Sequence, residues 1–264
     1  MSQAQVGVVG HTQFYASSAL GNNNAGFHNS IFRGKNLGAF NATHQAAIAA
    51  GTFDDIFNGD FWQSSFVRRN QDGSAIDTIT VNWRIHGFNV KKNKGSTAVS
   101  ANSALVWPDQ CLGKIRMNAT DTTAGGYAGT ELRSSGRDVI KSQIASAFTL
   151  NGTSYLLTYK DLLSKAVTDG QSSSWDWYDC DVEVPSDVNL TGAKHWGTGF
   201  DVGCDAIWPL EAITQEFVCN RVHCWLRSVA SASYFSYLYN GGNVSNWGPA
   251  SNSGLWFRPF FLIS

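Results

Sequence analysis

The chain has 264 residues, a formal net charge of −1 and 43% hydrophobic residues, enough to bury the core of one large domain or two small ones. Only 15% of the residues are charged, so Gly, Ser, Asn and Thr make a polar but uncharged surface. The balanced charge argues against a nucleic-acid partner, and no apolar run reaches transmembrane length, so we expect no membrane insertion. The N-terminus lacks a basic segment followed by an apolar block, which predicts no signal peptide.

Residues 1 to about 30 are rich in Gly, Ser and Asn and show no periodicity, which predicts an extended arm or loop that could support oligomerisation. The next element is a short helix. Asn41 or Thr43 can serve as its N-cap, an alanine-rich run gives it propensity, and Gly51 ends it.

Residues 78–90 are β-branched with partial alternation and predict a strand, and a second strand ends at Pro108. Residues 135–148 place four apolar side chains at helical spacing, which predicts an amphipathic helix packed on a core. A turn at Asn151–Gly152 and a strand-like YLL follow. Thr158 and Asp161 then form a T-x-x-D pattern typical of a capping box, so we expect a helix to about Val167.

A short helical turn is expected at Pro185–Ser186, and from Gly197 onward the pattern favours strands and turns. The last run, residues 256–263, is too apolar for an exposed tail, and Pro259 indicates an edge strand or a bulge there. The predicted class is α+β, with two or three helices around small, loop-rich antiparallel sheets and long ordered loops.

The segment Ser233–Trp256 carries no charged side chain and mixes Tyr, Trp, Ser, Asn and Gly, the residues that dominate antibody binding loops. Tyr and Trp offer large contact areas with few torsions to freeze, and Ser, Asn and Gly offer adaptable hydrogen bonds. An exposed aromatic patch without charge also risks non-specific association, so a protein that keeps one is expected to use it. The segment therefore predicts a binding surface.

Catalytic and metal motifs such as GxSxG, HExxH, a P-loop or GxGxxG do not occur, and the six histidines are far apart in sequence. We therefore predict no enzyme, no cofactor and no metal site. The five cysteines are odd in number and lack CxxC spacing, which favours buried thiols in a protein made in a reducing cytoplasm. Cys219 and Cys224 are close enough in sequence to leave a redox pair or a soft-metal site as an alternative.

A family resemblance rests on the C-terminal run CWLRSVASASYFSYLYNGG and ASNSGLWFRPFFLI. The run resembles the C-terminal half of C-type-lectin-fold variable proteins of diversity-generating retroelements, which have a W-L-R-S strand, a patchy polar segment and a closing G-x-x-R-P-x-F-x-I strand. The matching residues here are Trp225, Leu226, Arg227, Ser228, Gly254, Arg258, Pro259, Phe261 and Ile263. FRGKNLG from Phe32 and GTFDDIFNGDFW from Gly51 also resemble the front part of phage head-fibre or tail-fibre proteins.

The resemblance implies a C-type-lectin-like domain of the formylglycine-generating-enzyme-like subclass over residues 31–264, with a variable segment at about 228–257. It implies a receptor-binding or adhesion protein on a phage virion, made in the host cytoplasm, whose partners are a host cell-surface protein or glycan and other virion proteins. It also implies a homo-oligomer, a trimer in some members, with residues 1–30 as an arm for oligomerisation or virion attachment.

In such proteins the varied codons are mostly of the AAY type, mutated at adenine, and cannot encode Lys, Glu, Gln, Met or Trp. No Lys, Glu, Gln or Met occurs between Ser228 and Phe257. Trp247 and Trp256 are not reachable from such codons, so they are framework residues or come from other codons, although both can still contact ligand. The predicted ligand-binding residues are Tyr237, Leu238, Tyr239, Asn240, Asn243, Val244, Ser245, Asn246, Trp247, Asn252, Leu255 and Trp256.

Three residues are predicted to support this segment from the framework, namely Trp225, Arg227 and Arg258. We expect the two arginines to be buried or half-buried and to donate hydrogen bonds to loop carbonyls. Two alternative functions remain open. One is a structural decoration or fibre subunit of the virion, and the other is a copper oxidase of the formylglycine-generating type that would use Cys219 and Cys224.

Overall fold

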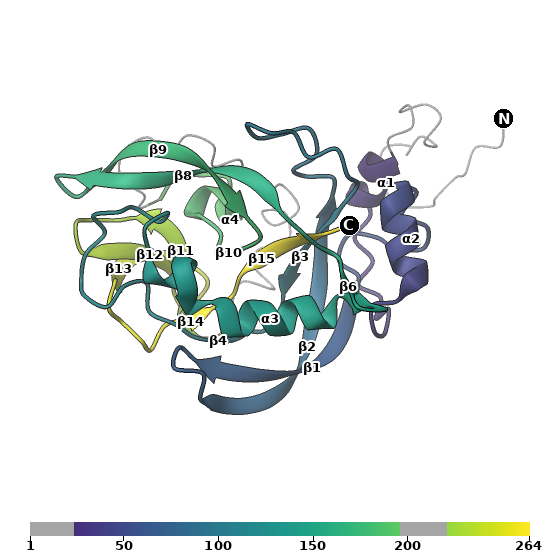
Figure 1. The fold of residues 1–264 in the computed structure, drawn as a ribbon, viewed down its shortest axis with the longest axis horizontal. Coiled ribbons are helices and arrows are strands. Elements are labelled where there is room, and N and C mark those ends of the chain that lie inside the picture. The colour runs from purple at the N-terminus through teal and green to yellow at the C-terminus, as the bar shows by residue number, and fades with distance from the viewer. Residues whose placement is uncertain (1–23, 196–220) are drawn as a thin grey trace.

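The computed structural model describes residues 24–195 and 221–264, which form a mixed α+β structure that is mostly sheet (Figure 1). This confirms the predicted α+β class. The helices in the described residues are short: α1 (Asn24–Ser30), α2 (Ala42–Ala50), α3 (Asp138–Ala147) and α4 (Asp187–Thr191), with a π-helical turn η1 (Leu132–Gly136) before α3. None of these helices is long and apolar enough to cross a membrane.

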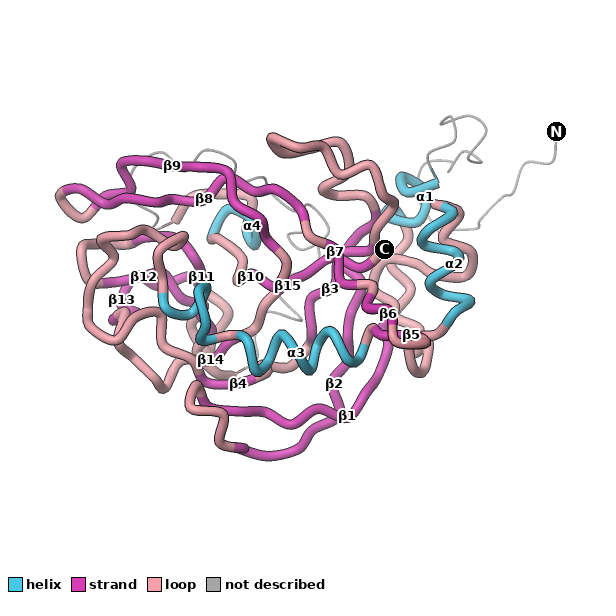
Figure 2. Tube along the Cα trace, in the orientation of Figure 1, coloured by secondary structure: helices cyan, strands magenta, loops and turns pink. Residues whose placement is uncertain are grey.

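One mixed sheet contains eleven of the described strands, in the order β10-β15-β3-β2-β1-β4-β14-β11-β12-β13, with β7 paired to β15 (Figure 2). Its strands are β1 (Phe61–Asn70), β2 (Ala75–Phe88), β3 (Ala104–Pro108), β4 (Gly113–Lys114), β7 (Leu156–Leu157), β10 (Val182–Glu183), β11 (Cys224–Val229), β12 (Tyr234–Leu238), β13 (Val244–Pro249), β14 (Trp256–Phe257) and β15 (Phe260–Ile263). Two separate hairpins pair β5 (Thr149–Leu150) with β6 (Thr153–Ser154), and β8 (Tyr159–Thr168) with β9 (Gln171–Cys180). The main sheet is therefore larger than the small sheets predicted.

The core is built around the ring of Phe148, which directly follows α3. Phe148 meets Trp62 of β1, Trp83 of β2 and Phe261 of β15 edge to face, with ring centroids 5.8, 5.7 and 5.4 Å apart. Edge-to-face packing matches the positive edge of one ring to the negative face of the next. One aromatic side chain thus joins α3 to three strands of the sheet.

The chain end enters this core, as the sequence predicts. β15 is fully buried and pairs with β3, β7 and β10. It is therefore an interior strand, and Pro259 occupies the break between β14 and β15. This corrects the edge strand or bulge expected at Pro259: the proline lies where no ladder hydrogen bond is required of it.

Three predicted helix boundaries, in two helices, are confirmed by their caps. The Asn41 side chain accepts hydrogen bonds from the first turn of α2, and Gly51 ends the helix with a left-handed φ of 72°. Ser186 caps α4 through a capping box with Asn189. In both places a local residue pattern specifies a local hydrogen bond, which is why the sequence predicts them.

The helix predicted from Thr158 to about Val167 is wrong, because this segment is strand β8. Its buried side chains Tyr159, Asp161 and Leu163 alternate with period two, as a half-buried strand requires. Asp161 is buried in an ion pair with Arg227 and does not cap a helix. The turn at Asp169 and Gly170, with φ of 51° and 75°, closes the β8–β9 hairpin and was the overlooked signal.

The part of the predicted arm that the structure describes, residues 24–30, is helix α1 and packs against β2. The Asn29 side chain donates to the Phe88 carbonyl at 3.0 Å and accepts from the Phe88 amide at 2.7 Å. The described structure thus includes a helix before residue 31. Residues 1–23 and the strands predicted between 197 and 210 lie outside the described residues.

Replacing Phe148 by Ala is expected to lower the free energy of unfolding by ~3–5 kcal/mol, because the cavity opens between α3 and three strands. Urea denaturation monitored by tryptophan fluorescence measures this loss. Trp177→Ala is the matched control, since this β9 ring is 41% exposed, and it should cost less than ~1 kcal/mol. Equal losses in the two variants would contradict the central position of Phe148.

Candidate binding face

The predicted binding segment forms one end of the main sheet, where β11, β12 and β13 follow one another and β13 is the edge strand among the described residues. These strands lie at the end of the molecule opposite α1 and α2 (Figure 1). The turn between β12 and β13 is closed by a hydrogen bond from the Tyr239 amide to the Asn243 carbonyl at 2.8 Å. This fixes the segment as an antiparallel hairpin on a buried strand. We use the name display face for the side chains of this hairpin that reach solvent, together with His223: Tyr234, Tyr239, Asn240, Asn243, Ser245, Asn246, Trp247 and His223.

Trp225 of β11 supports the display face from beneath. Its indole N–H donates to the Ile115 carbonyl at 2.5 Å, and its side chain is fully buried. Gly248 of β13 lies directly on this ring: a Cβ there would be 2.7 Å from the Trp225 Cζ3 atom. Only glycine permits such a close approach, so the hairpin is seated on Trp225 as the framework prediction requires.

Arg227 ties β11 to the β8–β9 hairpin through charge. Its guanidinium donates to Asp161 at 2.9 Å, and the Lys91 ammonium lies 3.4 Å from the other carboxylate oxygen. All three side chains are buried. Although burial raises the pKa of Asp161, the charges of Arg227 and Lys91 hold it below its usual range. Arg227 is thus buried as predicted, and its partner among the described contacts is the carboxylate of Asp161.

Arg258 is also buried, and it donates to the carbonyl of Pro108, the last residue of β3, at 2.7 Å. Its guanidinium carbon lies 3.7 Å from the centroid of the Trp107 ring, a stacking that stabilises a cation. Burial lowers the pKa of Arg258, while nearby thiols and Asp109 raise it. The predicted burial of Arg258 is confirmed, but the acceptor that it contacts here lies at the end of a strand and not in a loop.

Trp247 is the most exposed aromatic side chain in the described residues, at 72%. The strand register explains its direction. Phe235 pairs with Gly248, and Tyr237 pairs with Ser245. Two residues of β13, Asn246 and Trp247, therefore lie opposite one residue of β12, Ser236. Such a β-bulge turns a side chain away from the regular alternation of the strand. Trp247 then stacks on Tyr234 with ring planes 8° apart and centroids at 6.5 Å.

Tyr239 continues the display face at the β12–β13 turn. It is 41% exposed and stacks on His223, with ring centroids 4.7 Å apart and planes at 28°. Tyr237 lies behind them, 5.3 Å from His223 and 6.3 Å from Tyr239 between centroids. The exposed ring of Tyr239 is therefore held by two other aromatic rings.

The structure separates the predicted ligand-binding residues by burial. Tyr239, Asn240, Asn243, Trp247 and Asn252 are exposed, and Ser245, Asn246 and Trp256 are half-buried. The prediction that the side chain reaches solvent is wrong for four residues, which pack into the core: Tyr237, Leu238, Val244 and Leu255. Leu238 and Val244 face each other across β12 and β13, and as the apolar members of the hairpin they anchor it instead of displaying it.

The side chains of Trp256 and Asn252 contact other parts of the structure. Trp256 belongs to β14 and has two cations over its ring, Arg68 at 4.7 Å and Lys114 at 5.0 Å. Asn252 accepts a hydrogen bond from the Gly254 amide at 2.8 Å and so shapes the loop before β14. Two residues of the display face, Tyr234 and His223, were missed. Tyr234 could have been found from its aromatic character next to a turn, whereas the stacking of His223 depends on the fold.

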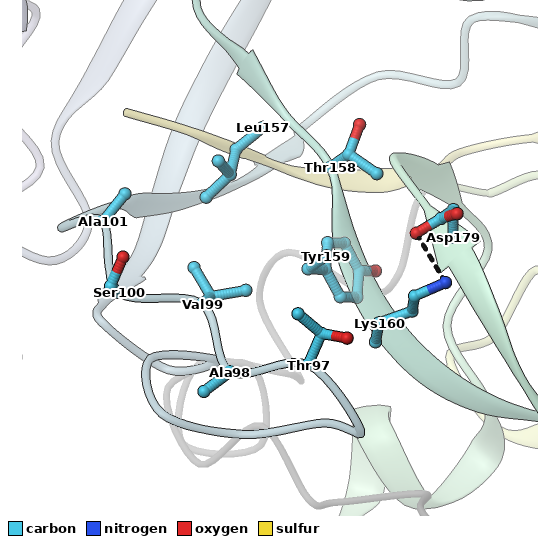
Figure 3. Close-up of a pocket in the computed structure, with 10 residues that line it drawn as sticks. All are labelled: Thr97, Ala98, Val99, Ser100, Ala101, Leu157, Thr158, Tyr159, Lys160 and Asp179. Carbon is cyan, nitrogen blue, oxygen red and sulfur yellow. Dashed lines mark ion pairs between the residues drawn. The ribbon is translucent and has the colours of Figure 1, made fainter.

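Two cavities lie outside the display face. One, of ≈ 270 Å³, lies between residues 97–101 and the start of β8, with Tyr159 at its wall and the Lys160–Asp179 ion pair, 3.0 Å long, at its rim (Figure 3). The other, of ≈ 480 Å³, lies between the tip of the β8–β9 hairpin and the turn that contains Ser231 and Ala232. Neither is lined by residues predicted to bind ligand.

Buried ionisable groups form a second cluster under β10. Glu183 accepts from the Tyr127 hydroxyl at 2.6 Å and pairs with Arg137 at 2.8 Å and Arg133 at 3.4 Å. Burial and the Glu183 charge raise the pKa of Tyr127 well above its usual value. Neither cavity is lined by this cluster. Its hydrogen bond and ion pairs join β10 to Tyr127, Arg133 and Arg137 within the framework.

No group of three or more His, Cys, Asp or Glu side chains able to hold a metal occurs in residues 24–195 and 221–264. Cys111, Cys180 and Cys224 are buried thiols, as predicted for cysteines of this chain. Cys204 and Cys219 lie outside the described residues, so the predicted alternative of a Cys219–Cys224 pair has no structural description. Cys224 instead lies 2.9 Å from Cys111, measured between the sulfur atoms.

Comparison of the chain with protein-family models, with curated proteins and with solved structures gave no match.

The Asp161–Arg227 pair predicts a pH dependence of stability. A carboxylate whose folded-state pKa is depressed stabilises the fold above its unfolded-state pKa, about 4, and loses this contribution as the pH falls through the folded-state value. Asp161→Asn removes the negative charge that compensates for the buried cations of Arg227 and Lys91. This should lower the free energy of unfolding by ~3–5 kcal/mol at pH 7. Urea unfolding at pH 7 and pH 3 measures both effects.

The wild type should lose more stability than Asp161→Asn between these two pH values. Asp138→Asn, an exposed carboxylate at the start of α3, serves as the control and should follow the wild type. Equal pH dependence in wild type and Asp161→Asn would show that this pair does not hold β11 to β8.

Proposed function

We propose that this chain is a receptor-binding or adhesion protein whose display face is a hypervariable ligand-binding surface within residues 228–257. The observation that carries the proposal is Trp247, which is 72% exposed on a bulged edge strand and backed by a parallel tyrosine ring. A tryptophan held rigidly in solvent loses little conformational freedom on binding and buries a large area. Such residues dominate the energy of known interfaces.

The arrangement of burial supports a fixed framework with changeable positions on it. Every residue of β11 is buried, and the closing strand β15 is fully buried. By contrast, Ser245, Asn246 and Trp247 of β13 and the turn residues Tyr239, Asn240 and Asn243 reach solvent. Substitutions at solvent-facing positions away from caps and buried contacts usually change stability little, so these six positions can vary without cost to the fold.

The chemistry of the face favours a glycan or protein surface as partner. Aromatic rings and the amide side chains of Asn240, Asn243 and Asn246 are presented without a charged group between Ser228 and Phe257. Such a surface avoids the desolvation penalty that fixed charges impose on an unmatched partner. In the proposal the partner is a host cell-surface protein or glycan, the chain stands on a phage virion, and its domain has the C-type-lectin-like fold of the formylglycine-generating-enzyme-like subclass.

One observation favours a second candidate, a structural subunit of the virion. β13 is an edge strand in the described residues, and the exposed rings lie beside it. An edge strand with a neighbouring aromatic patch is also a surface on which a further subunit can dock. In that case Trp247 would bury itself against another copy or another virion protein.

Binding of the fluorescently labelled chain to a panel of bacterial cells and immobilised glycans tests the proposal. Trp247→Ala, Tyr239→Ala and Asn246→Ala should each reduce binding at least about tenfold, because each removes contact area from the display face. Their melting temperatures should stay close to that of the wild type, since Trp247 and Tyr239 are exposed and Asn246 is only half-buried. Trp177→Ala removes an exposed ring outside the display face and should bind normally.

Unchanged binding by Trp247→Ala would overturn the assignment of the display face. Light scattering separates the structural candidate: an assembly that Trp247→Ala dissociates, without loss of cell or glycan binding, would favour packing between subunits. The nucleotide sequence beside the coding region tests the hypervariability. The proposal expects a near-repeat of the region for residues 228–257 that differs mainly at adenines, next to a reverse transcriptase gene.

A further inference from the structure

Two buried thiols meet at the base of the display face. Cys111 lies in the connection between β3 and β4, and Cys224 is the first residue of β11. They are 113 residues apart in sequence, yet their sulfur atoms are 2.9 Å apart, and each residue is only 2% exposed. Contact between two side chains so distant in sequence is imposed by the fold.

The backbone around both residues is held by the same strand, β14. The Leu112 amide, next to Cys111, donates to the Phe257 carbonyl at 2.8 Å. Cys224 pairs with Trp256, and the Trp256 amide donates to the His223 carbonyl at 2.8 Å. Because one strand positions both chain segments, the sulfur contact follows from the sheet register and not from a mobile loop.

The guanidinium of Arg258 adds a buried positive charge near this pair. Its two terminal nitrogens are buried and have no hydrogen-bond partner among the described residues. The negative charge that Cys111 and Cys224 carry when ionised raises the pKa of Arg258. The contact with Cys111 and burial raise the pKa of Cys224, whereas the Arg258 cation lowers it. Thiolate, the reactive form, is therefore scarce at neutral pH, and slow reaction with small oxidants is expected.

We propose that Cys111 and Cys224 form a reversible intramolecular disulfide when the protein meets a peroxide, and that this bond ties β11, the strand beneath the display face, to the connection between β3 and β4. One thiolate attacks a peroxide oxygen, which breaks the O–O bond and gives a sulfenic acid and water. The second thiol then attacks that sulfur, an S–S bond forms, and the hydroxyl leaves as water. Two thiols are oxidised, and hydrogen peroxide is reduced to two waters.

The consequence is a change in stability that depends on the medium. A disulfide between residues this far apart removes much of the freedom of the unfolded chain. In a reducing compartment the thiols persist and the chain folds without the bond, and outside it the bond holds β11 against the connection between β3 and β4. This inference rests on the sulfur contact alone and does not depend on the ligand of the display face.

Tryptic mapping of the peroxide-treated wild-type protein tests the pairing. After unfolding and alkylation of remaining thiols, digestion without reductant separates four cysteine peptides: 95–114 with Cys111, 166–194 with Cys180, 195–221 with Cys204 and Cys219, and 222–227 with Cys224. The proposal expects peptides 95–114 and 222–227 to be linked, with the loss of two hydrogen masses. A link between 222–227 and 195–221, or alkylated Cys224 throughout, would overturn it.

The melting temperature tests the staple. Peroxide treatment should raise that of the wild type by an amount on the order of 10 °C, and a thiol reductant should reverse the shift. Cys111→Ser should show no such rise, and Cys180→Ser, a buried thiol away from the pair, should behave as the wild type. A linked protein with an unchanged melting temperature would overturn the stabilising role. If Cys111→Ser does not fold, the wild-type peptide map and its reversal by reductant decide the question.

Discussion

The buried ion pair between Arg227 and Asp161 is the constraint on which the display face depends. A charge removed from water is costly unless a partner compensates for it, and Arg227 and Asp161 do so at 2.9 Å, with Lys91 beside them. Because Arg227 is on β11 and Asp161 on β8, the pair fixes the strand beneath the face against a hairpin that is not part of the main sheet. The position of the face thus follows from electrostatics as well as from the ladder of hydrogen bonds.

Apolar packing completes the support from the other side. The Trp225 ring packs against Gly248 of the hairpin, and Leu238 pairs with Val244 inside it. The polar and aromatic side chains of β13 and the β12–β13 turn are left to solvent. The segment therefore combines two kinds of residue in alternation, anchors that point inward and contacts that point outward, within a few positions of each other.

The sequence predicts this arrangement where the deciding interaction is local. Asn41 and Gly51 cap a helix that lies between them, and both caps are visible in the residues themselves. Asp161 shows the opposite case. Its spacing from Thr158 fits a capping box, but its partner is Arg227, 66 residues away, and no local pattern announces that contact.

The sequence predicted a binding segment and twelve residues within it, and four of those residues are buried, for the same reason. The uncharged, aromatic composition of residues 233–256 is plain in the sequence. Which side chains face outward depends on the register of β12 against β13, and a bulge opposite Ser236 shifts that register. Tyr237 and Leu238 could not be recognised as buried without knowing the strand pairing, because a slip of one residue exchanges the two faces of a strand.

The bulge at Asn246 and Trp247 has a further consequence for how the protein behaves at high local concentration. Edge strands invite pairing with the edges of other copies, and natural sheets prevent this with bulges and prolines. β13 has both, since the bulge interrupts its register and Pro249 is its last residue. The irregularity that turns Trp247 toward a partner thus also makes the strand a poor template for aggregation. The same edge of the sheet can bind a ligand without pairing with other copies of the chain.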